Sequence, residues 1–397
     1  MMNACITPGF LPANTCLPAG CNIDTRFWEV GEYSALYRAL IRFLSEVLDT
    51  SEMPFDCLAG RVTGQVQLRR NNGVLASAMG KCRQFMDLYD PDPRRSYTAD
   101  LKLFFDGYRE HPFGLVEPGM EARAPFTERA LVGEAYNDFI AFLRREAVKR
   151  RVRKQLADWK AGILLQRQTI HEYLAELYAS YHWLLIVRID HFYSEDAVDE
   201  RDLLPRMSWR PYYTGRWSQV PSDAPSSPEP VGETRARIDT GLAMADRNRF
   251  FRNQHGADGW LFDHMAGSIW KMEAGGQSSA NHFHGLYLFD GSRWNLSDLP
   301  RLINGLIHRW SSVTRGLGQS YSCHDSPGRQ QMIGKGTWVL GELDCKNPEH
   351  RTRLDTYVNY FAKTEFGKED AQAIRIKPRA KSNTLTMKHG RRQAGAD

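Results

Sequence analysis

The chain has 397 residues, of which 42% are hydrophobic and 25% are charged. These proportions are ordinary for globular proteins, and they exclude a collagen-like chain, a coiled coil and wholesale disorder. The net charge of +5 is too small to indicate a nucleic-acid partner by itself.

The sequence shows no sign of a membrane or secreted protein. It contains no run of eighteen or more apolar residues, and residues 1–10 lack the basic and apolar regions of a secretory signal. We therefore expect a cytoplasmic protein. The seven cysteines form no pair of CxxC units, which favours free thiols. A metal held by Cys5, Cys16 and Cys21 is the alternative to loose N-terminal thiols.

The first half of the chain has mostly helical patterning. Residues 1–25 are rich in Pro, Gly, Asn and Cys and are predicted to form an irregular leader. Apolar residues then recur every three or four positions over residues 33–48 and persist in this pattern over residues 127–181. We therefore expect a mainly helical N-terminal region over residues 1–180, to which no role is assigned.

Basic residues gather in two blocks. The first lies within the second helical stretch, is opposed only by Glu146, and consists of Arg144, Arg145, Lys149, Arg150, Arg151, Arg153 and Lys154. Such a block attracts phosphates, so we interpret it as DNA-binding, with a solvated helix face as the alternative. The second block runs from Arg375 to Arg392, with seven cations and no acid, and predicts a basic C-terminal tail over residues 373–397. A disordered basic tail is compatible both with phosphate binding and with a solvated surface.

The pattern changes at Trp183, where strands begin. Residues 183–190 form an apolar, β-branched run typical of a central strand. Pro, Ser and acidic residues over 220–233 predict a loop insertion, and residues 235–253 have helical spacing.

Two further strand-like runs, 267–273 and 282–289, flank turn residues and predict an antiparallel hairpin. They are followed by a predicted helix at 299–315, strands near 319–323 and 338–343, and a helix over 348–364. This order predicts an α+β fold with a ferredoxin-like antiparallel sheet and helices on one face, over residues 181–372.

The second strand of the hairpin begins with Asn281-His282-Phe283-His284-Gly285. Side chains alternate along a strand, so the two histidines point the same way, roughly 7 Å apart by the strand rise, and can converge on one cation. Glu273 closes the preceding strand and lies beside them in a hairpin with a short loop. This ligand set suits Mg²⁺ or Mn²⁺ with open positions for water and a phosphate oxygen. The alternative is that all three are ordinary polar groups at the surface.

The last predicted helix contains Asp355-Thr-Tyr357-Val-Asn-Tyr360-Phe-Ala-Lys363. Tyr357, Tyr360 and Lys363 follow one another at intervals of three residues, which places them on one helical face. A tyrosine can attack the phosphorus of a DNA phosphodiester and stay covalently attached to the 5′ end of the cut strand. A nearby lysine can stabilise the negative charge on the phenolate or on the phosphorane. An ordinary amphipathic helix with a buried aromatic stripe is the alternative.

Taken in order, these elements resemble the three motifs of HUH (histidine-hydrophobic-histidine) rolling-circle replication initiators. More narrowly, the chain resembles the phage replication-like proteins of filamentous phages and cryptic prophages, the inovirus gene-two-product (YagK/YfjJ) family. The resemblance covers about residues 180–392 and rests on Leu185-Ile-Val-Arg-Ile-Asp190, Trp270-Lys-Met-Glu273, His282-Phe-His-Gly-Leu-Tyr-Leu-Phe289 and Tyr360-Phe-Ala-Lys363.

The resemblance implies an HUH endonuclease domain in which Glu273, His282 and His284 hold a divalent metal. It also implies that Tyr360 is the nucleophile. Tyr357 is a second candidate, but initiators with two tyrosines usually separate them by four positions and this chain separates them by three. Asp190 matches a family pattern without an assigned role.

The implied function is replication initiation. The protein would nick single-stranded or hairpin DNA at a phage or prophage origin, leaving a 5′-phosphotyrosine link and a free 3′-hydroxyl, with host replication proteins as further partners. The main alternative is a catalytically inactive prophage protein that binds DNA with the same fold. A metal-dependent hydrolase without a tyrosine nucleophile is another. Relaxases of the same chemistry usually carry the tyrosine before the histidine motif, the opposite order to this chain.

Overall fold

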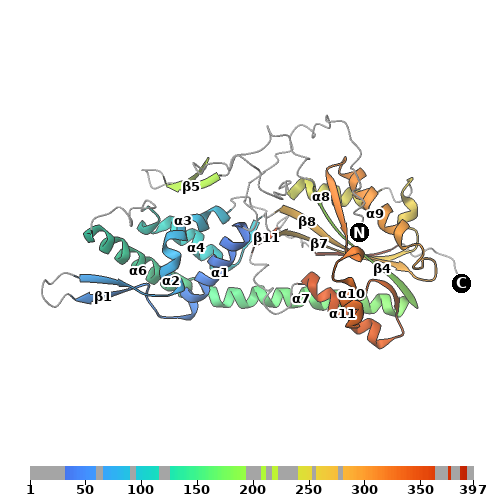
Figure 1. Ribbon diagram of the computed structural model, residues 1–397, viewed down its shortest axis with the longest axis horizontal. Helices are drawn as coiled ribbons and strands as arrows, with labels where there is room; N and C mark the ends of the chain where they lie inside the picture. Colours follow the sequence, from blue (N-terminus) through green and yellow to red (C-terminus); the bar gives the residue numbers. More distant parts are fainter. Residues whose placement is uncertain are drawn as a thin grey trace, which may run out of the picture.

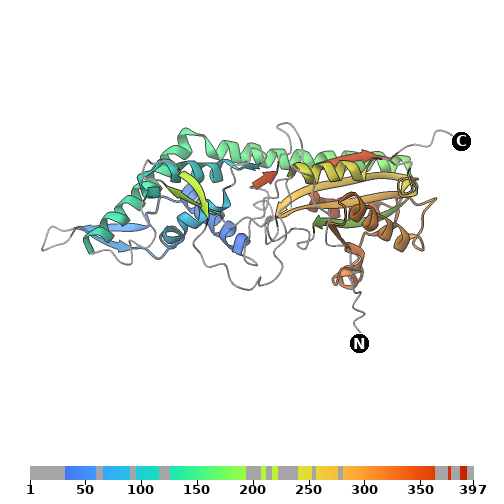
Figure 2. The ribbon, with the colours of Figure 1, turned by 90° about the horizontal axis from the view of Figure 1, so that it is seen from above.

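The computed structural model describes residues 32–59, 66–89, 95–115, 126–193, 207–211, 217–221, 240–252, 256–275, 280–362, 374–376 and 385–390. Over these residues the protein is a mixed α+β molecule with a helical N-terminal part and a sheet-based C-terminal part. The long helix α7 (Val152–Ser180) runs along both parts (Figures 1 and 2). The expected leader at 1–25 and most of the expected loop at 220–233 lie outside the described residues.

The N-terminal part consists mainly of helices around an aromatic core. The helices are α1 (Glu32–Asp49), α2 (Val74–Ala78), α3 (Cys82–Phe85), α4 (Ala99–Glu110) and α6 (Phe126–Lys149). Buried apolar residues recur at helical spacing along α1, and its Phe43 lies 5.8 Å from Phe104 of α4, ring centre to ring centre. This burial of one helix face explains why α1 forms here.

Short strands accompany these helices. An antiparallel pair is formed by β1 (Phe55–Ala59) and β2 (Val66–Arg70), and a second pair by β5 (Met207–Pro211) and β6 (Trp217–Pro221). Strand β3 (Arg95–Tyr97) pairs with β11 (Ile374–Ile376) from the far end of the chain.

The C-terminal part is built on a six-stranded antiparallel sheet. Its order is β10–β4–β8–β7–β12, and β9 pairs with the second half of β4 on the edge that also carries β10. The strands are β4 (Trp183–Tyr193), β7 (Met265–Gly275), β8 (Ala280–Asp290), β9 (Gly318–Ser322), β10 (Gly341–Asp344) and β12 (Leu385–His389). The predicted hairpin is confirmed, because β7 and β8 pair with Glu273 opposite His282.

Helices cover both faces of this sheet, so the expectation of helices on one face is wrong. One face packs against α8 (Thr240–Phe250) and α9 (Leu299–Val313), and the other against α11 (Pro348–Ala362) and the last turns of α7. The reason lies in β4, where Ile186 faces one side and Val187 the other, both fully buried. A sheet that is apolar on both faces needs a cover on each. The short helix α10 (Arg329–Gly334) lies between β9 and β10.

The end of α7 therefore belongs to the sheet. Ile170, Leu174 and Leu177 pack in the same core as Leu184 and Ile186 of β4. The domain boundary expected at residue 180 coincides with the end of α7. The last turns of this helix, before the boundary, already pack in the core of the sheet.

The segment expected to be a disordered basic tail contributes two strands, so that expectation is wrong for residues 374–376 and 385–389. Strand β11 pairs with β3 of the N-terminal part, and β12 pairs with β7 at the edge of the sheet. Leu385 and Met387 alternate with polar residues and pack against the sheet core. Their burial outweighs the repulsion among the neighbouring cations.

Two smaller findings concern the described residues only. Cys82, Cys323 and Cys345 are free thiols, and the other four cysteines have no described side chain. None of the described helices has the length and apolar character needed to cross a bilayer.

Candidate metal centre and tyrosine helix

The hairpin β7–β8 brings three metal-ligating side chains together. Glu273 lies directly across from His282 in the strand register, and His284 follows two residues later on the same strand face. The Nε2 atoms of the two histidines lie 3.2 Å apart. Oε2 of Glu273 lies 3.3 Å from Nε2 of His284 and 3.9 Å from Nε2 of His282.

This donor set fits a single divalent ion. Ligand atoms about 2.0–2.2 Å from one ion lie about 3–4 Å from one another, which is the spacing found here. The three atoms are all within 4.8 Å of each other, and among the described residues this is the group of His, Cys, Asp and Glu side chains that could hold a metal. His282 and Glu273 keep 19% and 16% of their side chains exposed, so the centre is open to a ligand from outside.

A carboxylate behind the cluster orients His284. The Nδ1 atom of His284 lies 2.9 Å from Oδ1 of Asp190, whose strand β4 pairs with β8 at this residue. Nδ1 therefore donates to Asp190, which leaves Nε2 as the atom that faces Glu273 and His282. Burial alone would raise the pKa of Asp190, but the hydrogen bond from His284 and the charge of Arg188 hold that pKa well below its usual range.

The cluster favours positive charge at His284. Burial lowers the pKa of this imidazole, yet the bonds to Asp190 and Glu273 outweigh burial and raise the pKa to about 9. The same carboxylates that favour a proton on this ring favour a metal cation beside it.

Arg188 connects the metal cluster with the tyrosine helix. Its side chain is 9% exposed and lies 3.3 Å from Asp190 through Nε. Its Nη1 donates a hydrogen bond of 2.8 Å to the hydroxyl of Tyr357 on α11. Burial raises the pKa of Tyr357 to about 12 despite the opposing charge of Arg188. The guanidinium thus sits where it can stabilise negative charge on a phenolic oxygen.

Helix α11 crosses the sheet face that carries the cluster. Tyr357 lies at Arg188, and Phe361, one turn later, lies 6.3 Å from His284 between ring centres. Tyr360 belongs to the same turn of α11 as Phe361, but its side chain lies outside the described residues, as does the whole of Lys363. The structure therefore places the backbone of Tyr360 near the cluster and leaves the Lys363 prediction open.

Two buried cations lie beside the cluster, and neither of them was assigned to the site from the sequence. Arg188 is one, and Lys271 is the other: it lies across from His284 in the register and donates to Oε1 of Gln166 of α7 at 3.0 Å. The signal was present, because each charge interrupts an apolar run two residues before an acidic residue on the same strand face.

The basic block predicted to bind DNA does not lie at the metal cluster. It lies at the junction of α6 and α7, while Gln166 reaches the cluster region roughly 20 Å further along α7 by the helix rise. Arg151, between the two helices, has a left-handed backbone with φ of 53°.

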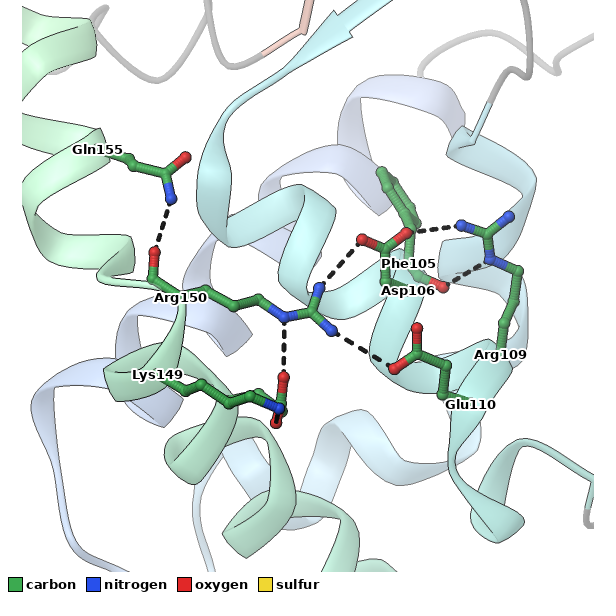
Figure 3. A network of polar contacts seen from close by, with 8 residues as sticks. Phe105, Asp106, Arg109, Glu110, Lys149, Arg150 and Gln155 are labelled. Atoms are coloured by element: carbon green, nitrogen blue, oxygen red, sulfur yellow. Dashed lines mark hydrogen bonds and ion pairs between the residues drawn. The ribbon is translucent and has the colours of Figure 1, made fainter.

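Part of the block holds the N-terminal part together. Arg150 bonds to Glu146 at 2.9 Å, to Asp106 at 3.0 Å and to Glu110 at 3.4 Å, which ties α6 to α4 (Figure 3). Arg144 donates to backbone carbonyls at the end of α1 and just beyond it. These two arginines are engaged internally, so they are poorly placed to contact DNA.

The remaining cations of the block are exposed. Lys149 and Arg153 make ion pairs at the surface, with Glu146 and Asp49, and Arg145 lies 3.9 Å from Asp138. The exposed side chains of Arg151 and Lys154 make no ion pair with any described residue. These five define the part of the block that is available to a phosphate.

Comparison of the chain with protein-family models, with curated proteins and with solved structures finds no match. The chemistry of the chain must therefore be inferred from the geometry of its own site.

Proposed function

We propose that this protein is a metal-dependent DNA-nicking enzyme of the HUH type, which initiates replication at a phage or prophage origin. The observation that carries the proposal is the convergence of Glu273, His282 and His284 on paired strands, beneath a helix with two tyrosines. A ferredoxin-like core is part of the proposal. The order β9/β10–β4–β8–β7 supports it, because a split βαβ unit interleaves its strands in this manner.

Each residue of the site has its own role in the proposed reaction. A bound Mg²⁺ or Mn²⁺ would polarise a non-bridging oxygen of the scissile phosphate. Glu273, His282 and His284 would hold this ion, and Asp190 keeps His284 in the tautomer that exposes Nε2. Lys363, three residues after Tyr360, would neutralise charge that develops at the phosphorus centre.

The chemical step is a transesterification. The oxygen of Tyr360 forms a bond to phosphorus, and the bond from phosphorus to the 3′ oxygen breaks. The phenolic proton is released and a proton is taken up by the leaving oxygen, which becomes a 3′-hydroxyl. The 5′ phosphate stays on the tyrosine, and resealing is the same step in reverse.

Tyr360 is preferred over Tyr357 because of the course of α11. The hydroxyl of Tyr357 is bound by Arg188, which lies on the Nδ1 side of His284, away from the edge that faces the other ligands. The helix approaches His284 itself at Phe361, in the turn that contains Tyr360. We assign Tyr357 and Arg188 to positioning the helix and its neighbouring charges.

The test is a covalent adduct. Full-length protein is incubated with labelled single-stranded and hairpin oligonucleotides that span the origin of its own genetic element, with Mn²⁺ or with EDTA, and resolved on a denaturing gel. We expect an adduct that requires Mn²⁺, disappears in Tyr360→Phe and persists in Tyr357→Phe and in the control Tyr89→Phe, which lies in the N-terminal part.

Other outcomes have definite meanings. An adduct lost in Tyr357→Phe but kept in Tyr360→Phe moves the nucleophile to Tyr357. Tight DNA binding without an adduct on any oligonucleotide contradicts the proposal and favours an inactive DNA-binding protein.

A further inference from the structure

A recess lined by four arginines opens in the helix layer on the opposite side of the sheet from the metal cluster. It has a volume of about 500 Å³ and lies at the C-terminal ends of α8 and α9. Its lining residues are Arg249, Arg252, Arg309, Ser312, Val313 and Arg315. None of them belongs to the site described above.

Two of the arginines have a structural role. Arg309 is 6% exposed and donates to the carbonyls of Phe250 and Arg252 and, at 3.0 Å, to Asp258. Arg249 donates to Asp246 at 2.7 Å and to the carbonyl of Val313 at 3.0 Å. A cation at a helix C-terminus binds exposed carbonyls and interacts favourably with the helix dipole. These contacts account for the positions of Arg249 and Arg309 without a ligand.

Arg252 and Arg315 have no comparable structural role. The exposed side chain of Arg252 has no hydrogen bond or ion pair with any described residue. In Arg315, buried Nε and Nη2 atoms have no hydrogen-bond partner within the described part of the chain, and Nη2 approaches only Asp246, at 3.9 Å. Arg315 also holds a left-handed backbone, with φ of 60°, which is uncommon for a residue with a side chain.

The charges of the recess do not balance. Asp246 is fully buried and already bonds to Arg249 and to Tyr193, and Asp258 is bound by Arg309. Four guanidinium groups thus face two carboxylates that are already bonded. A planar guanidinium with free donors matches the oxygens of a phosphate, so the chemistry of the recess calls for an anion of this kind.

The recess and the metal cluster lie at the same end of the sheet. Tyr193, which bonds to Asp246 beside the recess, is three residues after Asp190 of the cluster, about 10 Å along β4 by the strand rise. Arg315 leads directly into β9, whose Gly318 pairs with Tyr193. A nucleic-acid strand that crosses this end of the sheet can contact both sites.

We infer that the arginine recess binds a backbone phosphate of the nucleic-acid strand whose scissile phosphate lies at the metal cluster. The identification of the ligand as a nucleic-acid strand rests on the proposed function. The expectation that the recess binds an anion rests on its arginines alone. Arg252 and Arg315 make the phosphate contacts, and Arg249 and Arg309 hold the two helix ends that carry them.

The experiment measures binding without cleavage. The affinity of full-length protein for a fluorescent single-stranded 20-mer is measured by anisotropy in EDTA over a series of salt concentrations. The double variant Arg252→Ala/Arg315→Gln is compared with Arg293→Ala/Arg301→Gln, which makes the same charge change at exposed positions outside the recess. Circular dichroism melting verifies that each variant is folded.

We expect the recess variant to bind about tenfold more weakly and to lose about 0.7 units from the slope of log affinity against log salt, because the recess neutralises one phosphate and each neutralised phosphate of a single strand contributes about 0.7. The control variant keeps the wild-type slope. Equal slopes in the two variants overturn the inference.

A second arm titrates inorganic phosphate into the protein by calorimetry. Phosphate binding that is lost in the recess variant, with unchanged affinity for the 20-mer, assigns the recess to a small phosphate ligand and also overturns the inference. Failure of the tyrosine adduct assay alongside a reduced salt slope in the recess variant removes the nicking proposal and leaves the recess assignment standing.

Discussion

His284 is positioned by contacts on both ring nitrogens. Nδ1 bonds to Asp190 at 2.9 Å, and Nε2 lies 3.3 Å from Glu273. Asp190 in turn lies beside Arg188, so the carboxylate that orients the imidazole is itself held in place. A ligand oriented in this way keeps its metal-binding atom ready before the ion arrives, which lowers the entropic cost of binding.

Asp190→Asn is therefore expected to weaken metal binding at the cluster. The amide keeps the shape of the carboxylate but removes the charge that makes His284 a better ligand, so Mn²⁺ affinity falls about tenfold or more. Electron paramagnetic resonance of free Mn²⁺ during a titration measures the affinity. Asp158→Asn, an exposed position on α7, is the matched control and leaves the affinity unchanged. Wild-type affinity in Asp190→Asn would show that the ring needs no such support.

At the scale of elements, the close contact of α7 with the sheet requires a glycine on β7, Gly267. The hydroxyl of Tyr173 accepts a hydrogen bond of 2.9 Å from the backbone nitrogen of Ser268 and donates one of 2.7 Å to the carbonyl of Lys388. A Cβ atom at Gly267 would lie 2.0 Å from this hydroxyl oxygen. Glycine at this position thus lets the helix approach β7 and bond to two strands at once.

Gly267→Ala is expected to lower the free energy of unfolding by about 1–3 kcal/mol, because the tyrosine must move and the core becomes overpacked. Urea denaturation followed by tryptophan fluorescence measures the change. Gly162→Ala, on α7 itself, is the control, because no atom lies within 4 Å of the added Cβ. It raises helix stability by up to about 1 kcal/mol. A neutral Gly267→Ala would contradict the close packing of α7 on β7.

At the scale of the whole molecule, the two parts of the protein are joined by a helix from the middle of the chain and by strands from its end. The helix α7 runs along both parts, and the strands β11 and β12 lie one in each part (Figure 2). Strand β11 pairs with β3 in the N-terminal part, and β12 pairs with β7 in the sheet. Two connections therefore join the parts: the helix α7 and the C-terminal strands β11 and β12.

Truncation tests this second connection. A chain that ends at residue 373 loses β11 and β12, including Leu385, which is 7% exposed, and should be about 2 kcal/mol or more less stable. A chain that ends at residue 390 keeps both strands and should unfold as the full chain does. Urea midpoints of the three proteins provide the comparison. Equal midpoints for the first truncation and the full chain would mean that the strands add nothing.

Local patterns predicted much of the sheet-based part. Strand periodicity and turn residues predicted the hairpin and the position of Glu273 beside the histidine strand, and helical spacing predicted α9 and α11 close to their observed bounds. The tail strands were missed because they are short, three and five residues long, and lie in a segment whose most prominent feature is its positive charge. The cover on the second sheet face was missed because no periodicity says which helix packs on which face.

The sequence by itself determined the grouping of the three candidate metal ligands. Glu273, His282 and His284 lie on one hairpin, so alternation along two neighbouring strands is enough to bring them together. Only the tertiary structure decided what surrounds the cluster. Arg188 and Tyr357 are 169 residues apart, and the arginine recess joins the ends of two helices. Such contacts depend on how separate elements pack, and packing is set by the shape and burial of the whole core rather than by any local spacing.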